Sequence, residues 1–243
     1  MRLGTVLVII VFLILPHFSL GQANPYMEHE EERRKMVEHD ILSYPGLEIH
    51  DTAIIDALLK VPRHAFIPSE LKAYAYLNRP IPIGFGQTIS QPVIVASMTQ
   101  LLSPVQGQRI LEIGTGSGYQ AAILGELGCE VYSIEIVPEL GQRAMKILKT
   151  LGYENVHVKV GDGYYGWPEV APFDRIIVTC APEEVPTPLV EQLKPSGRIV
   201  IPVGKEDQVQ YLLVMKKSKK GTLSRELKYP VRFVPMTGEA SKK

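Results

Sequence analysis

A glycine-rich turn between residues 109 and 119 constrains the fold of this chain more than any other stretch. The apolar run from Arg109 to Ile113 leads into three glycines at alternate positions, Gly114, Gly116 and Gly118. An apolar segment with helical spacing, Ala121 to Leu127, follows at once. This order predicts a strand, a tight turn and a helix, with glycine where a side chain would keep a ligand away from the backbone. A glycine-rich turn that binds nothing is the alternative at this point.

The residues around this turn alternate between apolar strands and amphipathic helices, which is typical of a parallel sheet flanked by helices. The predicted strands are Arg109–Ile113, Val131–Ile134, Val156–Val160, Arg175–Val178 and Arg198–Pro202, and the predicted helices are Gln120–Leu127, Pro138–Leu151 and Pro186–Leu193. The interior strands are almost continuous runs of Val and Ile, as expected when helices cover both faces. The fold class is therefore α/β, with a mostly parallel, doubly wound, Rossmann-like sheet.

Beyond residue 205 the helical pattern stops. Two β-like runs, Gln210–Met215 and Leu227–Val234, flank a lysine-rich turn and predict an antiparallel hairpin that closes the sheet. With no internal repeat, residues 24–243 are expected to form one domain. It divides into N-terminal helices and a loop region over the site (24–104), a Rossmann-like core (105–204) and the hairpin (205–243).

The segment before the core has two parts of different composition. Residues 25–43 are rich in charge and carry an apolar stripe, so we expect an amphipathic helix with a solvated face rather than a partner site. A second helix is expected over 51–60, with Asp51 as its N-cap. Residues 62–92 combine prolines and glycines with many apolar side chains, which indicates an ordered irregular segment covering a site. Helical periodicity returns from Pro92 to Leu102.

The first 23 residues resemble a secretory signal. Leu3 to Leu15 carries no charge, and Gly21 and Ala23 suit a cleavage site after Ala23. The apolar core is short for a membrane span, which needs about 20 residues. Cleavage would leave no stable membrane association, whereas an uncleaved anchor is the main alternative.

Composition excludes some classes of partner and cofactor. Lys plus Arg and Asp plus Glu both number 26, so there is no basic field for nucleic acid. Cys129 and Cys180 are the two cysteines, and a single pair is neither a disulfide framework nor a metal-site spacing. We expect two buried free thiols. The six histidines show no zinc-binding pattern, so no metal is predicted.

Three acidic residues select the ligand of the glycine turn. A pyrophosphate site uses GxGxxG, whereas this turn is GxGxG and follows Glu112, which would repel a pyrophosphate but suits an ammonium and a sulfonium. Glu135 ends the next strand, where carboxylates bind ribose hydroxyls. Asp162 follows the third strand, where it could meet an adenine amino group. Each acid alone could be a cap or a surface residue; together they point to S-adenosylmethionine.

At this point the sequence resembles the protein-L-isoaspartate (D-aspartate) O-methyltransferase family over about residues 61–237. The resemblance is carried by Val61-Pro62-Arg63-His64-Ala65-Phe66-Ile67-Pro68, Gly86-Gln87-Thr88-Ile89-Ser90-Gln91-Pro92, Leu111 to Tyr119, Gly161-Asp162-Gly163 and Phe233-Val234-Pro235-Met236-Thr237. The glycine motif is shared by many methyltransferases. The two segments before it are much more specific.

The resemblance implies a methyl transfer from S-adenosylmethionine to the free carboxylate of L-isoaspartyl and D-aspartyl residues in damaged proteins and peptides, which begins their repair through a succinimide. It makes Ser90 the active-site serine, although Ser90 could also be the N-cap of the helix near Pro92. The cofactor-binding residues expected on these grounds are Thr88, Ile89, Ser90, Glu112, Gly114, Thr115, Gly116, Gly118, Glu135, Asp162, Gly163 and Thr237.

Two other functions stay open on the sequence. One is a methyltransferase acting on a different acceptor, a small molecule or RNA, and the other is a scaffold that binds cofactor without catalysis. The signal-like segment also implies export, while the resemblance implies a cytoplasmic enzyme near its cofactor supply. We expect a monomer that binds isoaspartyl proteins and peptides and no nucleic acid.

Overall fold

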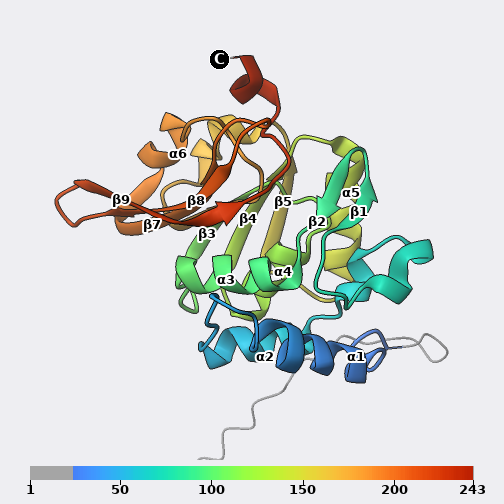
Figure 1. Cartoon of the computed structure of the whole chain (residues 1–243). Helices are drawn as coiled ribbons and strands as arrows, with labels where there is room; N and C mark the ends of the chain where they lie inside the picture. The colour runs from blue at the N-terminus through green and yellow to red at the C-terminus, as the bar shows by residue number, and fades with distance from the viewer. Residues whose placement is uncertain (1–23, 243) are drawn as a thin grey trace, which may run out of the picture.

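The computed structural model describes residues 24–242, which form a seven-stranded sheet in the order β5-β4-β3-β6-β7-β8-β9 (Figure 1). The strands from β5 to β7 are parallel, and β8 and β9 run antiparallel to their neighbours. Their bounds are β3 Arg109–Ile113, β4 Glu130–Glu135, β5 Val156–Val160, β6 Phe173–Val178, β7 Leu193–Val203, β8 Gln210–Lys217 and β9 Leu223–Val231. This is the predicted doubly wound α/β architecture with a closing hairpin.

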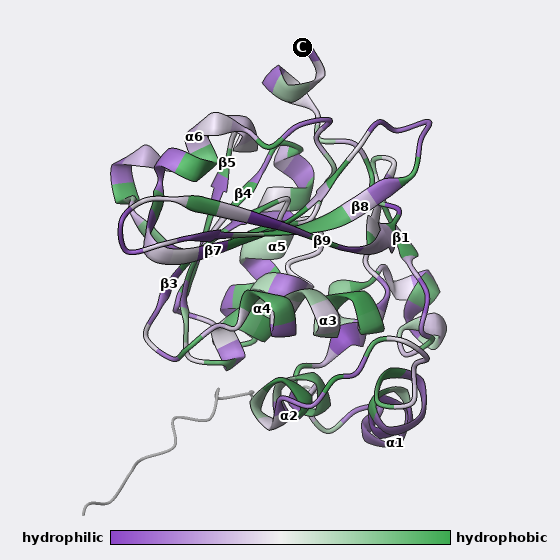
Figure 2. Cartoon of the chain, turned by 60° about the vertical axis from the view of Figure 1, so that its left-hand side comes forward, coloured by the Kyte–Doolittle hydropathy of each residue, from purple (hydrophilic) through white to green (hydrophobic). Residues whose placement is uncertain are grey.

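Helices cover both faces of the sheet, as the apolar strands require. They are α3 (Pro92–Leu102), α4 (Tyr119–Glu126), α5 (Pro138–Thr150) and α6 (Thr187–Glu191). Along β6, Ile177 packs with residues of α3 and α4, whereas Ile176 and Val178 pack with Leu189 of α6 on the opposite face. Figure 2 shows α3 and α4 as largely hydrophobic. Both helices are therefore buried between the sheet and the N-terminal segment.

The observed bounds differ from the predicted ones mainly around α6. A helix was expected over Pro186–Leu193, but α6 ends at Glu191 because Leu193 already belongs to β7. In the parallel pairing of β6 with β7, Leu193 lies opposite Phe173. Strand β7 is correspondingly longer than predicted, because it also includes the five residues before Arg198, of which Ser196 has a φ of +65°.

Three short helices precede the core. They are α1 (Glu30–Lys35), which continues as a π-helical turn η1 (Met36–Ile41), and α2 (Thr52–Lys60). The Asp51 carboxylate accepts hydrogen bonds from the amides of Ala53 at 3.0 Å and Ile54 at 3.4 Å, so the predicted N-cap is confirmed. Met36, Val37 and Ile41 are buried in the main apolar cluster.

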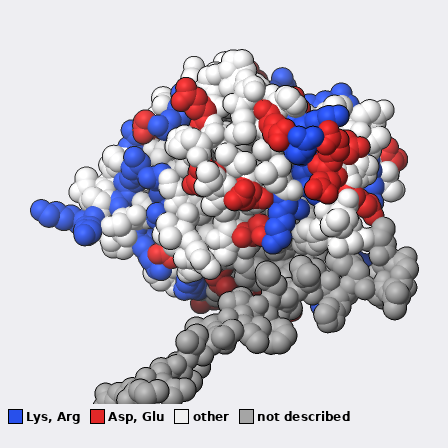
Figure 3. Space-filling model, turned by 90° about the horizontal axis from the view of Figure 1, so that it is seen from below, with Lys and Arg blue, Asp and Glu red and all other residues white. Residues whose placement is uncertain are grey.

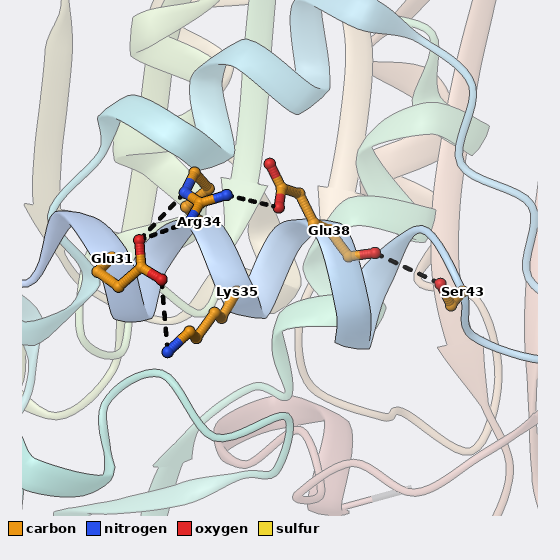
Figure 4. A network of polar contacts seen from close by, with 5 residues as sticks. All are labelled: Glu31, Arg34, Lys35, Glu38 and Ser43. Atoms are coloured by element: carbon orange, nitrogen blue, oxygen red, sulfur yellow. Dashed lines mark hydrogen bonds and ion pairs between the residues drawn. The ribbon is translucent and has the colours of Figure 1, made fainter.

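The opposite face of this N-terminal helix is solvated, as predicted. Arg34 pairs with Glu31 at 2.6 Å and with Glu38 at 3.0 Å, and Lys35 pairs with Glu31 at 3.4 Å (Figure 4). Each side chain is about half exposed, so such pairs stabilise the helix only slightly. Figure 3, seen from below, shows acidic and basic side chains side by side. The segment thus behaves as a solvated amphipathic helix.

Residues 62–92 are ordered, as predicted, but contain more regular structure than their prolines indicated. Two 3₁₀ turns, η2 (Arg63–Phe66) and η3 (Ser69–Tyr74), precede a small antiparallel ribbon of β1 (Ile81–Gly84) and β2 (Gln87–Ile89). Prolines are compatible with this ribbon because it lies outside the main sheet. Helix α3 then begins at Pro92 and ends at Leu102, as expected.

The hairpin also has a different end from the predicted one. Strand β9 stops at Val231, and the chain returns toward the core, where Ala181 and Pro235 form an isolated bridge. The Ala181 amide donates to the Val234 carbonyl at 2.8 Å, and the Met236 amide donates to the Ala181 carbonyl at 2.8 Å. Phe233 and Val234 thus lie outside the hairpin: the Gln210 side chain bonds both backbone groups of Phe233, and Ala181 after β6 bonds the Val234 carbonyl. The return brings Thr237 to the carboxyl ends of the parallel strands.

The signal-like segment, residues 1–23, lies outside the described residues. Within residues 24–242 no helix combines the length and apolar character that crossing a membrane requires.

Candidate active site

A cleft opens at the carboxyl ends of β3, β4 and β6. The chain proceeds from β3 to β4 on one side, while β6 lies on the other, and ligands of open α/β sheets bind at such a switch point. The cleft holds about 880 Å³ of space, which includes the solvent at its open mouth. Its walls come from β2 and the residue after it, the glycine turn, the ends of β4 and β6, Gly163, and the segment from Val234 to Thr237.

The glycine turn has backbone conformations that favour glycine, and at Gly114 it lies too close to a neighbour for a side chain. Gly114, Gly116 and Gly118 have φ of +93°, +53° and +90°, values that favour glycine. A Cβ at Gly114 would lie 2.5 Å from Oγ1 of Thr179. That hydroxyl is not free to move away, because it donates to the Gly114 carbonyl at 2.6 Å and contacts the Ile113 carbonyl at 3.0 Å. The turn is therefore a bare backbone cradle at the cleft.

Glu135 presents its carboxylate to the cleft from the end of β4. One oxygen accepts from the Gly116 amide at 2.7 Å and the other from the Val137 amide at 2.9 Å. The side chain lines the cleft and is otherwise well buried. Two backbone donors thus orient a carboxylate next to the glycine turn, where a sugar diol could meet it.

Asp162 and Gly163 follow β5 and link the site to the C-terminus. The Asp162 carboxylate accepts from the Tyr164 amide at 2.9 Å and from the Glu239 amide at 2.8 Å. Gly163 lines the cleft, and a Cβ there would collide with the side chain of Ile113. Asp162 itself lies behind this lining. Its hydrogen bond from the Glu239 amide holds the 3₁₀ turn η6 (Gly238–Lys242) beside the cleft.

Glu112 lies beneath the glycine turn and is fully buried. It accepts a short hydrogen bond from the Ser133 hydroxyl, which also shares a 2.6 Å hydrogen bond with the Thr115 hydroxyl. Burial raises the pKa of Glu112 to about 8, and the nearby Glu135 acts in the same direction, while the Ser133 bond opposes them. Thr115 lines the cleft but Glu112 does not. Its link to the turn therefore runs through two hydroxyls.

We expect the Glu112→Gln variant to gain stability over the wild type as pH rises. Between the unfolded pKa of 4.5 and the folded value near 8, the folded protein keeps a proton that the unfolded chain releases. Wild-type stability contributed by this group is complete below pH 4.5 and is lost as pH rises through 8, whereas glutamine never ionises. Thermal melts of the ligand-free proteins at pH 5 and pH 9 test this. An equal difference between the two proteins at both pH values would contradict it.

Thr88, Ile89 and Ser90 line the other wall of the cleft, from β2 to the start of α3. The N-cap of α3 is Gln91, without a side-chain capping bond, so the alternative role of Ser90 as a helix cap is wrong. The Ser90 carbonyl accepts from Nη2 of Arg63 at 2.6 Å. Within residues 24–242 no protein group binds the Ser90 hydroxyl, which leaves it available to a ligand. Thr237 completes the lining from the C-terminal return.

The structure thus brings nine of the predicted site residues to the cleft lining. These are Thr88, Ile89, Ser90, Gly114, Thr115, Gly116, Glu135, Gly163 and Thr237, while Glu112, Gly118 and Asp162 lie behind it. Gly118 supports the turn from the α5 side, where a Cβ would lie 3.3 Å from that of Ala144.

Comparison with known proteins identifies the family. A family model described as protein-L-isoaspartate(D-aspartate) O-methyltransferase matches residues 34–241. The chain belongs to this family. Protein-L-isoaspartate O-methyltransferase 1 of Nitrosospira multiformis is 50% identical over 211 residues, covering 87% of this chain and 89% of the relative. The enzyme of the same name from Cupriavidus necator is 56% identical over 194 residues, covering 80% and 75%.

Solved structures agree with this assignment. A protein-L-isoaspartate O-methyltransferase superimposes with a TM-score of 0.76 at 31% identity, over 87% of this chain and 66% of that chain. A Plasmodium falciparum structure titled as a putative protein-L-isoaspartate O-methyltransferase, in complex with S-adenosyl-L-homocysteine, gives 0.71 at 24% identity, over 86% and 98%. At 24% identity, the second match supports the fold alone.

In this member of the isoaspartyl methyltransferase family, the cleft also has residues that the sequence analysis missed. Thr179 and Cys180 directly follow β6, a fourth strand end beside the three that carried the predicted acids. Their position at a strand end was the available signal. Burial and the charges of Glu135 and Asp162 raise the pKa of the Cys180 thiol to about 12, so it is not a thiolate at neutral pH.

Both cysteines are free, as predicted, but only Cys129 is buried; Cys180 is half-buried, because it lines the cleft. Among the described residues no group of His, Cys, Asp and Glu side chains could hold a metal ion.

Proposed function

We propose that this protein transfers the methyl group of S-adenosylmethionine to the free carboxylate of L-isoaspartyl and D-aspartyl residues in proteins and peptides. The observation that carries the proposal is that Thr88–Ser90 and the glycine turn line the same cleft. The first segment is specific to the isoaspartyl methyltransferase family, and the second is the backbone cradle that many methyltransferases share.

The residues at the cleft fit an adenosyl cofactor. The bare glycine turn admits it to the backbone, and the Glu135 carboxylate is suited to two ribose hydroxyls. Gly163 and Thr237 would flank the adenosyl group from the ends of β5 and the C-terminal return. The bound cofactor supplies an electrophilic methyl group on a sulfonium.

The methyl transfer does not need an enzyme base to deprotonate the acceptor. The free carboxylate of an isoaspartyl or D-aspartyl residue has a pKa of about 4 or lower and is already ionised at neutral pH. The chain's own contribution is to align that carboxylate with the methyl group and to exclude water from two opposite charges. The Ser90 hydroxyl donates a hydrogen bond to one carboxylate oxygen and so aims the other. The resulting methyl ester carries a better leaving group than the free carboxylate. The backbone amide nitrogen attacks the ester carbonyl, the C–O bond to the methoxy group breaks, and methanol leaves as the succinimide closes and repair begins.

The experiment that tests this function is a methyl-transfer assay on two matched peptides. One contains an isoaspartyl residue and the other a normal aspartyl residue in the same sequence, with labelled S-adenosylmethionine as donor. We expect transfer to the isoaspartyl peptide and little to its counterpart. Equal rates would remove the repair assignment in favour of another acceptor, and absent transfer with normal cofactor binding would favour a non-catalytic scaffold.

The role of Ser90 gives a second test. We expect Ser90→Ala to lower kcat/KM for the isoaspartyl peptide about 10-fold to 30-fold, because one hydrogen bond to a charged group contributes about 1.5–2 kcal/mol. The affinity for S-adenosylhomocysteine should stay within about twofold of the wild type. Calorimetric titration and steady-state kinetics measure the two quantities. A methylated Ser90 trapped during turnover would instead make Ser90 a nucleophile.

We further propose that residues 24–243 form a single methyltransferase domain that acts as a monomer, and that residues 1–23 direct export and are cleaved after Ala23. The apolar run from Leu3 to Leu15 supports the second part. Cell fractionation with N-terminal sequencing of the mature protein tests the location and the cleavage site, and light scattering tests the oligomeric state. A mature protein that begins at Met1 and pellets with membranes would indicate an anchor.

A further inference from the structure

Arg63 is a fully buried arginine that belongs to none of the cleft walls. It lies in η2, and its guanidinium donates through Nε to the Ala75 carbonyl at 2.9 Å and through Nη2 to the Ser90 carbonyl at 2.6 Å. One side chain thus joins the end of η3 to the residue that carries the proposed hydrogen-bond donor. The two carbonyls are 15 residues apart in sequence.

The guanidinium also contacts the cofactor wall. Its central carbon lies 4.8 Å from the ring centroid of Tyr119, the first residue of α4 after the glycine turn, and Tyr119 lines the cleft. Burial lowers the pKa of Arg63 to about 10, so the group remains a cation at neutral pH. A buried cation is costly unless it is held by hydrogen bonds. Here Nε and Nη2 have backbone carbonyl acceptors, while Nη1 is buried without a partner among the described residues.

Ser90 needs such an anchor because local structure does not hold its peptide group. In the β1–β2 ribbon the register ends with Ile89 paired to Ile81, and α3 begins only at Pro92. Within the described residues the Ser90 hydroxyl has no protein partner, so its direction depends on the conformation of the Ser90 backbone. The planar fork of Arg63 restrains that backbone on the carbonyl side.

We propose that Arg63 is a positioning residue, which fixes the Ser90 peptide and thereby aims the Ser90 hydroxyl at the substrate carboxylate. The inference rests on the proposed function, in which Ser90 contacts that carboxylate. It assigns to the buried arginine of the Val61–Pro68 segment an effect on the alignment of substrate, exerted without touching it.

A double-mutant cycle tests this coupling. Arg63→Lys keeps the charge but loses the fork, and we expect kcat/KM for the isoaspartyl peptide to fall about 10-fold. In that background Ser90→Ala should lower kcat/KM less than about threefold, against about 10-fold to 30-fold in the wild-type background. The reason is that a misdirected Ser90 hydroxyl already contributes little to the alignment of the carboxylate. An equal cost of Ser90→Ala in both backgrounds would overturn the inference. A harmless Ser90→Ala in the wild-type background would instead overturn the proposed role of Ser90.

Arg33→Lys is the matched control. Arg33 is also buried and donates to the backbone carbonyls of Leu59, Glu28 and Tyr26, but in the N-terminal layer rather than beside Ser90. The cost of Ser90→Ala should keep its wild-type value in this background. If the Arg33→Lys background reduces that cost as much as Arg63→Lys does, the effect is general loosening and the inference fails.

Thermal melts and S-adenosylhomocysteine binding check that each variant is folded. Should Arg63→Lys not fold, Arg63→Gln serves in the same cycle, because it removes the buried charge together with the fork. The same two outcomes then apply to the Arg63→Gln background.

Discussion

Replacing Glu135 by alanine is expected to weaken the binding of S-adenosylmethionine and S-adenosylhomocysteine by about 100-fold or more. Hydrogen bonds to a charged group contribute about 1.5–3 kcal/mol each, and the carboxylate is suited to two ribose hydroxyls. The same carboxylate accepts from the Gly116 amide at 2.7 Å, so its loss also releases the glycine turn. Calorimetric titration of the folded variant measures the change. The kcat at saturating cofactor should fall much less than the affinity.

Glu130→Ala is the matched control for this prediction. Glu130 begins the same strand that Glu135 ends, but its side chain is about two-fifths exposed and pairs with His157 away from the cleft. We expect it to leave cofactor affinity within about twofold of the wild type, because an exposed ion pair contributes little. A Glu135→Ala variant with an affinity as high as that of Glu130→Ala would show that the end of β4 does not hold the ribose.

Gly114→Ala should abolish cofactor binding at ordinary concentrations, a loss of about 100-fold or more. The new Cβ would lie 2.5 Å from Oγ1 of Thr179 while the backbone stays at φ +93°. The left-handed conformation alone costs about 1–2 kcal/mol for a residue with a Cβ. Relief of the collision requires the turn to move or Thr179 to give up its bond to the Gly114 carbonyl. Titration with S-adenosylhomocysteine and a thermal melt separate lost binding from lost stability.

Gly107→Ala isolates the conformational part of that cost. Gly107 has φ of +79°, and a Cβ there would meet nothing within 4 Å. We expect a modest loss of stability and unchanged cofactor affinity, because Gly107 lies before β3 and away from the cleft lining. Normal cofactor binding by Gly114→Ala would contradict the view that this turn is a bare cradle.

Three acids at successive strand ends predict a ligand site, but the sequence does not show how they divide their roles. Glu135 alone lines the cleft. Glu112 comes one residue before the end of β3 and faces the interior, where Ser133 and Thr115 connect it to the turn. Alternation places neighbouring side chains of a strand on opposite faces, yet which face is solvated depends on the elements packed there.

The substrate side of the site depended still more on tertiary contacts. The Thr88–Pro92 segment was recognised by its resemblance to a family, not by a local rule. The tie from Arg63 to the Ser90 carbonyl spans 27 residues, and the carbonyl is a backbone group that every residue has. A hydrogen bond of that kind leaves no pattern in a single sequence.

Sequence alone determined the α/β class, the order of the parallel strands and helices along the chain, the glycine turn and the family. The first three follow from local periodicity and from backbone conformations that only glycine adopts readily. The family follows from the resemblance carried by segments such as Val61–Pro68 and Gly86–Pro92. Only the tertiary structure decided that Glu112 is buried, that the chain after β9 returns to pair with Ala181, and that Arg63 lies behind Ser90. Those outcomes depend on burial and on partners distant in sequence, which are settled when the layers pack together.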